Sequence, residues 1–369
     1  MSALIIVMVV LGTVLTVVGF ARLFARPVFL PKAQAPERAP VISVIIPARD
    51  EADNLGRLLP SLNAQSLKPR EILVVDDQSS DDTAGVARRH GAKVVSGVTP
   101  PDGWVGKSWA CRQGTEAAEG EVFLFLDADL ELEADALARL AAHAADHPSA
   151  VISACPWHRI ERPYEGLSVF FNLVMVGGIG AFTRRGWQAD GVGLFGQTLW
   201  ISRACYEETG GHELVRGRVL ENLSLAREFE SRGIERHCFL GRGAISMRMF
   251  PEGYGQLVAS WSKGFSRGAG LVAKVPLVLS SLGLTGLMIL MMCAFFSPLG
   301  DRNSLVVLAV AWLVVTLMLW RWMRLVGGFS LANALLFPIS LMFYQGLFAR
   351  SLSQQRRGGT VKWKGRDVA

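Results

Sequence analysis

The chain has 369 residues, of which 50% are hydrophobic and 19% are charged, and its mean hydropathy is +0.31. A typical soluble domain carries about 25% charged residues, so this chain is too apolar to be only a soluble protein, and the same content excludes a disordered one. Most of the net charge of +6 lies in the last twenty residues, directly after an apolar segment, which favours a membrane-surface tail over nucleic-acid binding. The basic side chains of this tail are Arg350, Arg356, Arg357, Lys362, Lys364 and Arg366.

The first apolar segment is an unbroken run at residues 3–20, followed by Arg22 and Arg26. Its length, together with the absence of a basic start and of a small-residue cleavage site, predicts an uncleaved membrane anchor over 1–26. Arginines directly after a span favour the cytoplasmic side for the chain that follows. We therefore expect a multi-pass protein of the cell (inner or plasma) membrane, with its catalytic domain and its tail at 350–369 in the cytoplasm.

Residues 40–250 alternate short β-rich runs with amphipathic stretches. A helix is expected over 51–65, because four of its leucines share one face. Alternation of strands and helices predicts an α/β domain with a mostly parallel sheet, whose ligands bind at the carboxyl ends of the strands. The strands are expected at 41–46, 72–75, 93–96 and 122–126.

Two aspartates follow the last of these strands, in Asp127-Ala128-Asp129. Their carboxylates repel one another at the sheet edge, and a hard divalent cation relieves the repulsion by taking oxygen ligands. Because Mg²⁺ usually completes its shell with substrate phosphates, the pattern predicts a diphosphate held through Mg²⁺ or Mn²⁺. The alternative is that one aspartate caps the helix that starts near Glu133.

A second acidic pair, Asp76-Asp77, follows the second strand, where a carboxylate can accept the N–H of a pyrimidine. One of the two is equally compatible with an Asx-turn. Lys107 lies in a turn at 103–109 that is rich in Gly and Trp and opens a helix. A lysine at a helix N-terminus can clamp a diphosphate, whereas the alternative is a solvated surface lysine.

Three further apolar segments lie at 275–297, 304–320 and 329–348. A short turn separates the first two, which predicts a hairpin. The third contains Asn333 and Pro338, which suit a broken, re-entrant or interfacial element as well as a span, so the number of crossings within 275–349 stays open. The stretch at 251–274 is expected to be interfacial and to close the active site.

Three segments resemble the family 2 glycosyltransferases of the GT-A fold, namely 43–51, 74–83 and Asp127-Ala128-Asp129. The resemblance implies an inverting transfer of a hexose from a nucleotide sugar, with UDP-glucose the expected donor, to a lipid acceptor. Other segments resemble the membrane-bound carotenoid glycosyltransferases, with hopanoid-associated enzymes as relatives, which implies a carotenoid or carotenoid acid as acceptor. These segments are 106–111, 156–158, 164–166, 171–173, 210–212, 248–253, 261–263 and 363–366.

The resemblance also implies roles for single residues. Metal binding falls to Asp127 and Asp129, and Lys263 or Arg267 would stand in for the basic element that closes over the diphosphate. The residues implied for the nucleotide sugar are Pro47, Ala48, Arg49, Glu51, Asp76, Asp77, Lys107, Asp127, Lys263 and Arg267. The residues implied for the acceptor are His158, Gln197, His212 and Trp261.

One departure concerns the Glu-Asp pair of the family, whose aspartate takes the proton of an acceptor hydroxyl. Here the pair reads Glu221-Asn222, and an amide cannot take a proton. Either Glu221 is the base, or no base is needed because the acceptor is a carboxylic acid, ionised above a pKa of about 4 to 5. A helix N-cap role for Asn222 is compatible with both. The candidate catalytic residues are therefore Glu221, Asn222 and Asp129.

Three other functions stay open at this point. A hopanoid or another polyisoprenoid can replace the carotenoid as acceptor. A polysaccharide synthase is disfavoured, because about three apolar segments are few for a secretion channel and no Gln-x-x-Arg-Trp is present. An inactive glycosyltransferase-like membrane scaffold is suggested by Asn222, but the intact acidic pairs argue against it.

Overall fold

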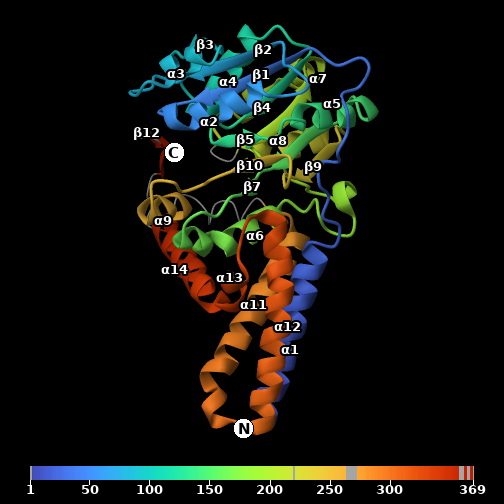
Figure 1. The fold of residues 1–369 in the computed structure, drawn as a ribbon, viewed down its shortest axis with the longest axis vertical. Helices are drawn as coiled ribbons and strands as arrows, with labels where there is room; N and C mark the ends of the chain where they lie inside the picture. Colours follow the sequence, from blue (N-terminus) through green and yellow to red (C-terminus); the bar gives the residue numbers. More distant parts are fainter. Residues whose placement is uncertain (1, 219–220, 263–271, 357–360, 364–365, 369) are drawn as a thin grey trace. The chain divides into compact units, whose positions relative to one another are not determined.

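Figure 1 shows the computed structural model of the chain, which describes residues 2–218, 221–262, 272–356, 361–363 and 366–368. The chain forms two compact units. The sheet unit comprises Val28–His158, Gly191–Arg248 and Thr360–Ala369, and the helical unit comprises Met1–Pro27, Arg159–Asp190 and Met249–Gly359.

The compact units do not follow the order of the chain, because residues 159–190, which lie inside the stretch 40–250 expected to be catalytic, belong to the helical unit. The expected roles of these segments stay predictions. A Cβ atom added at Gly177 would lie 2.4 Å from Leu23 Cδ2, so this apolar stretch packs directly on the N-terminal helix. Packing of Gly177 against a helix far away in sequence cannot be recognised from a local pattern, which explains the difference.

The strands of the central sheet are β1 (Ile42–Ala48), β2 (Glu71–Asp76), β3 (Lys93–Ser96), β4 (Val122–Leu126), β6 (Val151–Cys155), β8 (Thr198–Ser202) and β9 (Arg236–Leu240). Four of them, β1 to β4, begin and end close to the predicted positions, whereas β6, β8 and β9 were not predicted. In the described residues their order is β3-β2-β1-β4-β8-β6-β9. All neighbours are parallel except β8, which is antiparallel to both β4 and β6. The α/β fold with a mostly parallel sheet is therefore confirmed.

The helices and the smaller strands of this unit complete the fold. Leu55, Leu58, Leu59 and Leu62 are fully buried on one face of the first of these helices, as the leucine spacing predicted, and each contributes about 2 kcal/mol of burial. The helices are α2 (Ala52–Asn63), α3 (Thr83–Arg89), α4 (Gly106–Ala117), α5 (Ala136–Asp146), α7 (Arg203–Thr209), η3 (Gly211–Val215) and α8 (Glu221–Ser231). The small strands are β5 (Leu130–Leu132), β7 (Trp157–His158), β10 (Ile245–Met247), β11 (Val361–Trp363) and β12 (Arg366–Val368).

The loops that follow β1 and β2 hold one another in place. Asp50 and Gln78 both have positive φ, at 53° and 59°, a conformation that Asp and Asn tolerate better than most residues. The Asp50 carboxylate accepts hydrogen bonds from the backbone N–H of Ser80 at 2.7 Å and from its hydroxyl at 2.9 Å. Asp81 accepts the N–H of Ala52 at 3.0 Å. These bonds fix the edge of the sheet where β1 and β2 end.

Three helices of the helical unit are long and apolar enough to cross a membrane: α1 (Ser2–Leu23), α11 (Lys274–Phe296) and α12 (Arg302–Val326). The segment at 329–348 is broken into α13 (Leu331–Leu335) and α14 (Phe337–Arg356), and it is not among the three. The break falls at Leu336; Pro338 lies in the first turn of α14, a position that proline tolerates, and Asn333 lies within α13, where it forms a capping box with Ser330. The other helices of this unit are η1 (Pro163–Ser168), α6 (Val169–Gly178), η2 (Gly186–Gln188), α9 (Tyr254–Ser262) and η4 (Ser297–Leu299).

Glycines make the contact between α1 and α11. A Cβ atom on Gly19 would lie 2.5 Å from the backbone nitrogen of Gly283, and one on Gly286 would lie 2.4 Å from the carbonyl oxygen of Gly12. Close approach of backbones at small residues is how helices associate in a bilayer. The outward side chains of α1 remain exposed and apolar, which suits lipid contact: Leu4, Val7, Val10, Leu11, Val14 and Val18.

Candidate active site

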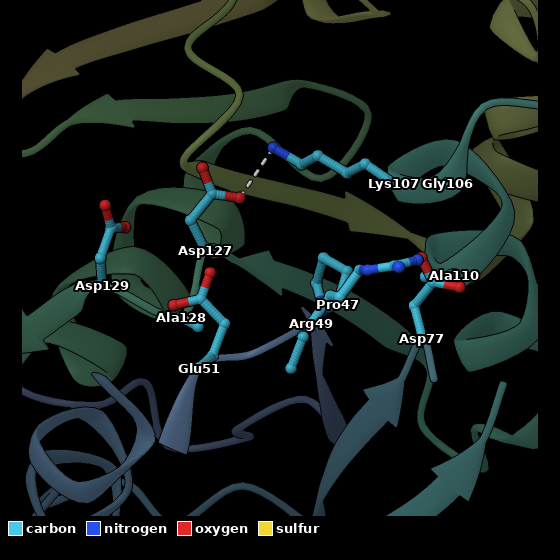
Figure 2. A pocket seen from close by; sticks show the side chains of 11 residues that line it. Pro47, Arg49, Glu51, Asp77, Gly106, Lys107, Ala110, Asp127, Ala128 and Asp129 are labelled. Carbon is cyan, nitrogen blue, oxygen red and sulfur yellow. Dashed lines mark ion pairs between the residues drawn. The ribbon is translucent and has the colours of Figure 1, made fainter. Parts of the chain in front are cut away.

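A cleft of about 200 Å³ lies where β1, β2 and β4 end (Figure 2). Parallel strands that end at one edge bring together residues that are far apart in sequence. Eight of the predicted residues line this cleft: Pro47, Ala48, Arg49, Glu51, Asp77, Lys107, Asp127 and Asp129. Gly106, Ala110 and Ala128 complete the lining.

Among the described residues, Lys107 is one of two basic residues that line the cleft, with Arg49, and it comes from the first turn of α4. Its Nζ lies 2.7 Å from Asp127 Oδ1 and 3.3 Å from Glu221 Oε1, and it donates to the carbonyl oxygen of Gly196 at 3.2 Å (Figure 2 shows the bond to Asp127). Burial by itself would lower the pKa of the Lys107 ammonium, but the charges of Asp127 and Glu221 outweigh burial and raise it. Lys107 is therefore a permanently charged group with two carboxylate partners.

Asp129 lies on the other side of Asp127, away from Lys107 (Figure 2). Burial raises the pKa of Asp129 to about 7, and the negative charges of Asp127 and Glu51 add to the effect. Its Oδ1 atom is buried and has no hydrogen-bond partner among the described residues. A buried carboxylate oxygen without a donor, beside two further carboxylates, fits a hard divalent cation such as Mg²⁺ or Mn²⁺. Asp129 and Asp127 are the residues that could hold it.

The acids after β2 differ from one another. Asp77 is 3% exposed, lines the cleft, and lies 3.7 Å from the guanidinium of Arg49. Asp76 accepts the backbone N–H of Ser79, three residues further along, at 3.0 Å, so its carboxylate holds the turn after β2, a local role like that of the Asx-turn considered for one of the two. Asp76 is not part of the cleft lining, so its predicted contact with a nucleotide stays a prediction.

Asn222 supports Glu221 at the start of α8. With the orientation of the amide that satisfies both of its ends, the nitrogen donates to Glu221 Oε1 at 2.9 Å and the oxygen accepts the N–H of Gly196 at 2.9 Å. Lys107 approaches the same carboxylate oxygen. Asn222 is therefore a hydrogen-bond partner of Glu221, and an aspartate at this position would place a second negative charge against it.

A second cavity of about 10 Å³, room for about one water molecule, adjoins the cleft through Pro47, Lys107 and Asp127. His212 lines this cavity and is buried, with its Nδ1 2.9 Å from the Tyr206 hydroxyl. Burial, followed by the charge of Lys107, lowers the pKa of His212 to about 3, so its imidazole is neutral.

The other acceptor residues that the sequence suggested are dispersed. Gln197 acts through its backbone, because its carbonyl oxygen accepts the N–H of Asp127 at 2.9 Å. His158 is buried in β7 of the small sheet, and Trp261 stacks on Phe171 in the helical unit, with ring centroids 4.6 Å apart. Gln197, His158 and Trp261 are not among the described residues that line the cavity of His212, and their contact with an acceptor stays a prediction. Lys263 and Arg267 lie outside the described residues.

Gly196 is the residue of this site that sequence reasoning missed. Its carbonyl oxygen accepts from Lys107 and its N–H donates to Asn222, so it joins the ammonium to the start of α8. A Cβ atom at this position would lie 2.4 Å from the Asn222 amide. Its place between Gly193 and Gln197 was the available signal, but a glycine in a loop predicts a turn as readily as a close approach.

Comparisons with known proteins identify the family and the fold of the chain. The pattern of the family "Glycosyl transferase family 2" matches residues 43–199. The chain is 32% identical to 4,4'-diaponeurosporenoate glycosyltransferase of Staphylococcus aureus strain USA300, over 89% of this chain and 88% of the relative, and equally to that of strain NCTC 8325 / PS 47. A mannosyltransferase from Pyrobaculum calidifontis, solved with GDP-Man and Mn2+, shares the fold, with a TM-score of 0.53 at 19% identity over 91% of this chain and 98% of that one. The chain therefore belongs to the family 2 glycosyltransferases and has a GT-A fold.

Proposed function

We propose that this enzyme transfers a hexose from a nucleotide sugar, with UDP-glucose the expected donor, to the carboxylate of a membrane polyisoprenoid, most simply a carotenoid acid. The observation that carries the proposal is the pair Glu221-Asn222. Where the family places an aspartate to remove the proton of a hydroxyl, this chain has an amide that donates to Glu221. An acceptor that has no proton to lose matches that arrangement.

The cleft supports the donor half of the proposal. Asp77 and Arg49 lie at the end of the cleft suited to a base, whereas Lys107, Asp127 and Asp129 suit a ribose and a diphosphate. Asp127 and Asp129 would hold Mg²⁺ or Mn²⁺. When bound, the cation neutralises charge that builds up on the departing diphosphate.

The acceptor half rests on chemistry and on the relative. The name of the S. aureus relative describes an acceptor that is a carboxylate, and the similarity extends over 89% of this chain. Three helices that are apolar enough to span a membrane suit an acceptor dissolved in a bilayer. We propose that the sheet unit faces the cytoplasm, where nucleotide sugars are made, because Arg22 and Arg26 follow α1.

The proposed step is a single displacement. One oxygen of the acceptor carboxylate forms a bond to the anomeric carbon, and the bond from that carbon to the diphosphate oxygen breaks, so the electron pair leaves with UDP. No proton is removed from the acceptor. Lys107 holds Asp127 and Glu221 in place during the step, and the anomeric configuration inverts, as in the family. The product is a sugar ester.

The test uses the full-length purified chain in nanodiscs with UDP-glucose, Mn²⁺ and two matched acceptors, a carotenoid acid and the corresponding alcohol. We expect the acid to be glycosylated at least tenfold faster. The product should be cleaved by mild alkali, which hydrolyses a sugar ester and leaves a glycoside intact. Equal rates on both acceptors, or an alkali-stable product, would contradict the proposal.

The acceptor skeleton is a separate question. Hopanoid and other polyisoprenoid acids offer the same carboxylate, and they enter the same assay as competitors of the carotenoid acid. Mass spectrometry of membrane lipids with and without the gene would identify the acceptor and the sugar together. If the strain without the gene lacks only a glycosylated hopanoid, the acceptor is a hopanoid and not a carotenoid.

A further inference from the structure

Three histidines form a cluster in the sheet unit that the proposed reaction does not use. His143 lies in the last turn of α5, His147 caps the end of that helix, and His237 is the second residue of β9 (both elements are labelled in Figure 1). One ring nitrogen from each can be chosen so that all three lie within 4.8 Å of one another. Positions four apart near the end of a helix place His143 and His147 on the same face, toward β9.

The hydrogen bonds in the cluster are those of a metal-binding imidazole. His237 Nε2 lies 3.1 Å from a carboxylate oxygen of Glu235, so the proton of this ring belongs on Nε2 and the lone pair on Nδ1. That Nδ1 atom lies 2.8 Å from His143 Nε2. A carboxylate that accepts from the far nitrogen of a histidine is the usual support of a metal ligand. A metal ion would replace the single proton that now lies between His143 and His237.

Two of the three rings have a pKa that favours the neutral form. Burial, followed by the neighbouring His237 and His147, lowers the pKa of His143 to about 4. Burial likewise lowers the pKa of His237, which is 5% exposed. Imidazoles that remain uncharged at neutral pH present lone pairs and do not repel a cation.

The cluster lies at the opposite edge of the sheet from the cleft. β9 is parallel to β6, and β8 is antiparallel to both β6 and β4, so β9 runs in the same direction as β4. His237 is near the beginning of β9, whereas Asp127 follows the end of β4. Strands that share a direction place these two residues at opposite edges.

We propose that His143, His147 and His237 bind one Zn²⁺ ion, separate from the metal of the cleft, which ties the end of α5 to the start of β9. Nitrogens bound to a tetrahedral zinc at about 2.0–2.1 Å lie about 3.4 Å apart, and the observed separations, from 2.8 Å up to 4.8 Å, bracket that value. Three imidazoles and no carboxylate in the first shell favour Zn²⁺ over Mg²⁺ or Mn²⁺. His147 is not fully buried, so a water molecule can take the fourth position.

The experiment titrates Zn²⁺ into the full-length chain, purified without a histidine tag and stripped with a chelator, in competition with a chromogenic chelator. We expect one Zn²⁺ per chain and a higher melting temperature on saturation. His147→Asn should weaken binding at least 100-fold, and Glu235→Gln, which keeps all three ligands, should weaken it about 10-fold. Co²⁺ in place of Zn²⁺ should give the visible absorption band of a four-coordinate site.

Two controls separate this site from other zinc binding. His90→Asn removes a histidine from the end of α3 outside the cluster and should leave zinc affinity unchanged, as should Asp129→Asn in the cleft. The metal-free His147→Asn variant should melt at the wild-type temperature, which shows that it folds. The proposal is overturned if the wild-type chain does not bind zinc, or if His147→Asn binds it as tightly as the wild type. The histidines would then be a structural cluster, stabilised by the hydrogen bond between His143 and His237.

Discussion

Asp127 and Asp129 lie two residues apart in one short turn, yet their carboxylates have opposite electrostatic surroundings. Asp127 has a cation of its own, with Lys107 Nζ at 2.7 Å. Asp129 has a pKa raised to about 7 by burial and by its acidic neighbours, and its Oδ1 has no hydrogen-bond partner in the part of the chain that the structure describes. The protein therefore supplies a counter-charge for Asp127, and we propose that a divalent cation from solution supplies one for Asp129.

The largest expected effect comes from Asp129→Asn. Loss of the carboxylate that lacks a partner removes a metal ligand, so transfer should fall by about 10³-fold and Mn²⁺ should no longer stabilise the protein. Asp127→Asn is the matched variant, and Mn²⁺ should still bind to it more tightly than to Asp129→Asn. Equal loss of Mn²⁺ affinity in a calorimetric titration of both variants would erase the distinction between the two aspartates.

Lys107→Met removes the ammonium group that pairs with Asp127, so that Asp127, like Asp129, has no lysine beside it in the described ranges. Asp127 and Glu221 then face one another without Lys107, so we expect kcat/KM for the donor to fall about 10²-fold and the unfolding free energy to fall by about 2 kcal/mol. Lys93→Met removes the charge of an exposed lysine in β3 and serves as the control. A Lys107→Met enzyme with wild-type donor kinetics would show that the ion pairs are only structural.

The pH dependence of stability tests Asp129 without any substrate. Its pKa in the metal-free folded protein, about 7, is above the ordinary value of about 3.9. The neutral carboxyl therefore contributes stability that is complete below about pH 4 and is lost as the pH rises through about 7. Melting curves in a chelator should show this loss, Mn²⁺ should reverse it above pH 7, and Asp129→Asn should lack it. A wild-type profile identical to that of Asp129→Asn would contradict the assignment.

Asn222→Asp adds a third carboxylate near Lys107, beside those of Asp127 and Glu221. The new acid can take a proton from a hydroxyl, so activity on the alcohol acceptor should rise about tenfold relative to the acid. The measurement is the ratio of rates on the two matched acceptors, and Asn222→Ala, which has no base, should not change the preference. An unchanged ratio in Asn222→Asp would mean that Asn222 does not determine the acceptor.

The smallest effect is expected at Asp50, whose carboxylate connects the loop after β1 to the loop after β2 through its hydrogen bonds with Ser80. Asn keeps the tolerance for positive φ and can still accept from Ser80, so Asp50→Asn should change the unfolding free energy by less than about 0.5 kcal/mol. Asp50→Ala loses both features and should cost about 1–2 kcal/mol. Denaturant unfolding of the two variants compares them directly. A large loss of transfer in Asp50→Asn would show that this acid also belongs to the catalytic group.

The sequence was sufficient for β1 to β4 of the central sheet and for the acids that follow β2 and β4, but not for β6, β8 and β9. Buried strands such as β4 are continuous apolar runs, and the topology of a parallel sheet then places Asp77, Asp127 and Asp129 at one edge. Lys107 could be recognised because glycines and tryptophans surround it at the start of a helix. Each of these features depends on residues that are close together in the sequence, so it can be predicted from the sequence alone.

The partners of these residues could not be predicted. Lys107, Gly196 and Glu221 come from three separate elements, and their contacts depend on how those elements pack. The same holds for the support that Asn222 gives to Glu221, since the sequence alone offered an N-cap as readily. The cluster of three histidines was missed because His237 comes from β9 and lies far along the chain from the pair at the end of α5.

The glycine contact between α1 and α11 also constrains the order in which the protein can mature. Residues 28–158 and 191–248 of the sheet unit are all synthesised between these two helices. Until α11 has been made, the close contacts at Gly12 and Gly19 cannot form, and this face of α1 cannot yet pack against α11. Domains generally fold as units during synthesis. The sheet unit can therefore fold while it is tethered by one helix, and the helical unit closes around that first helix afterwards.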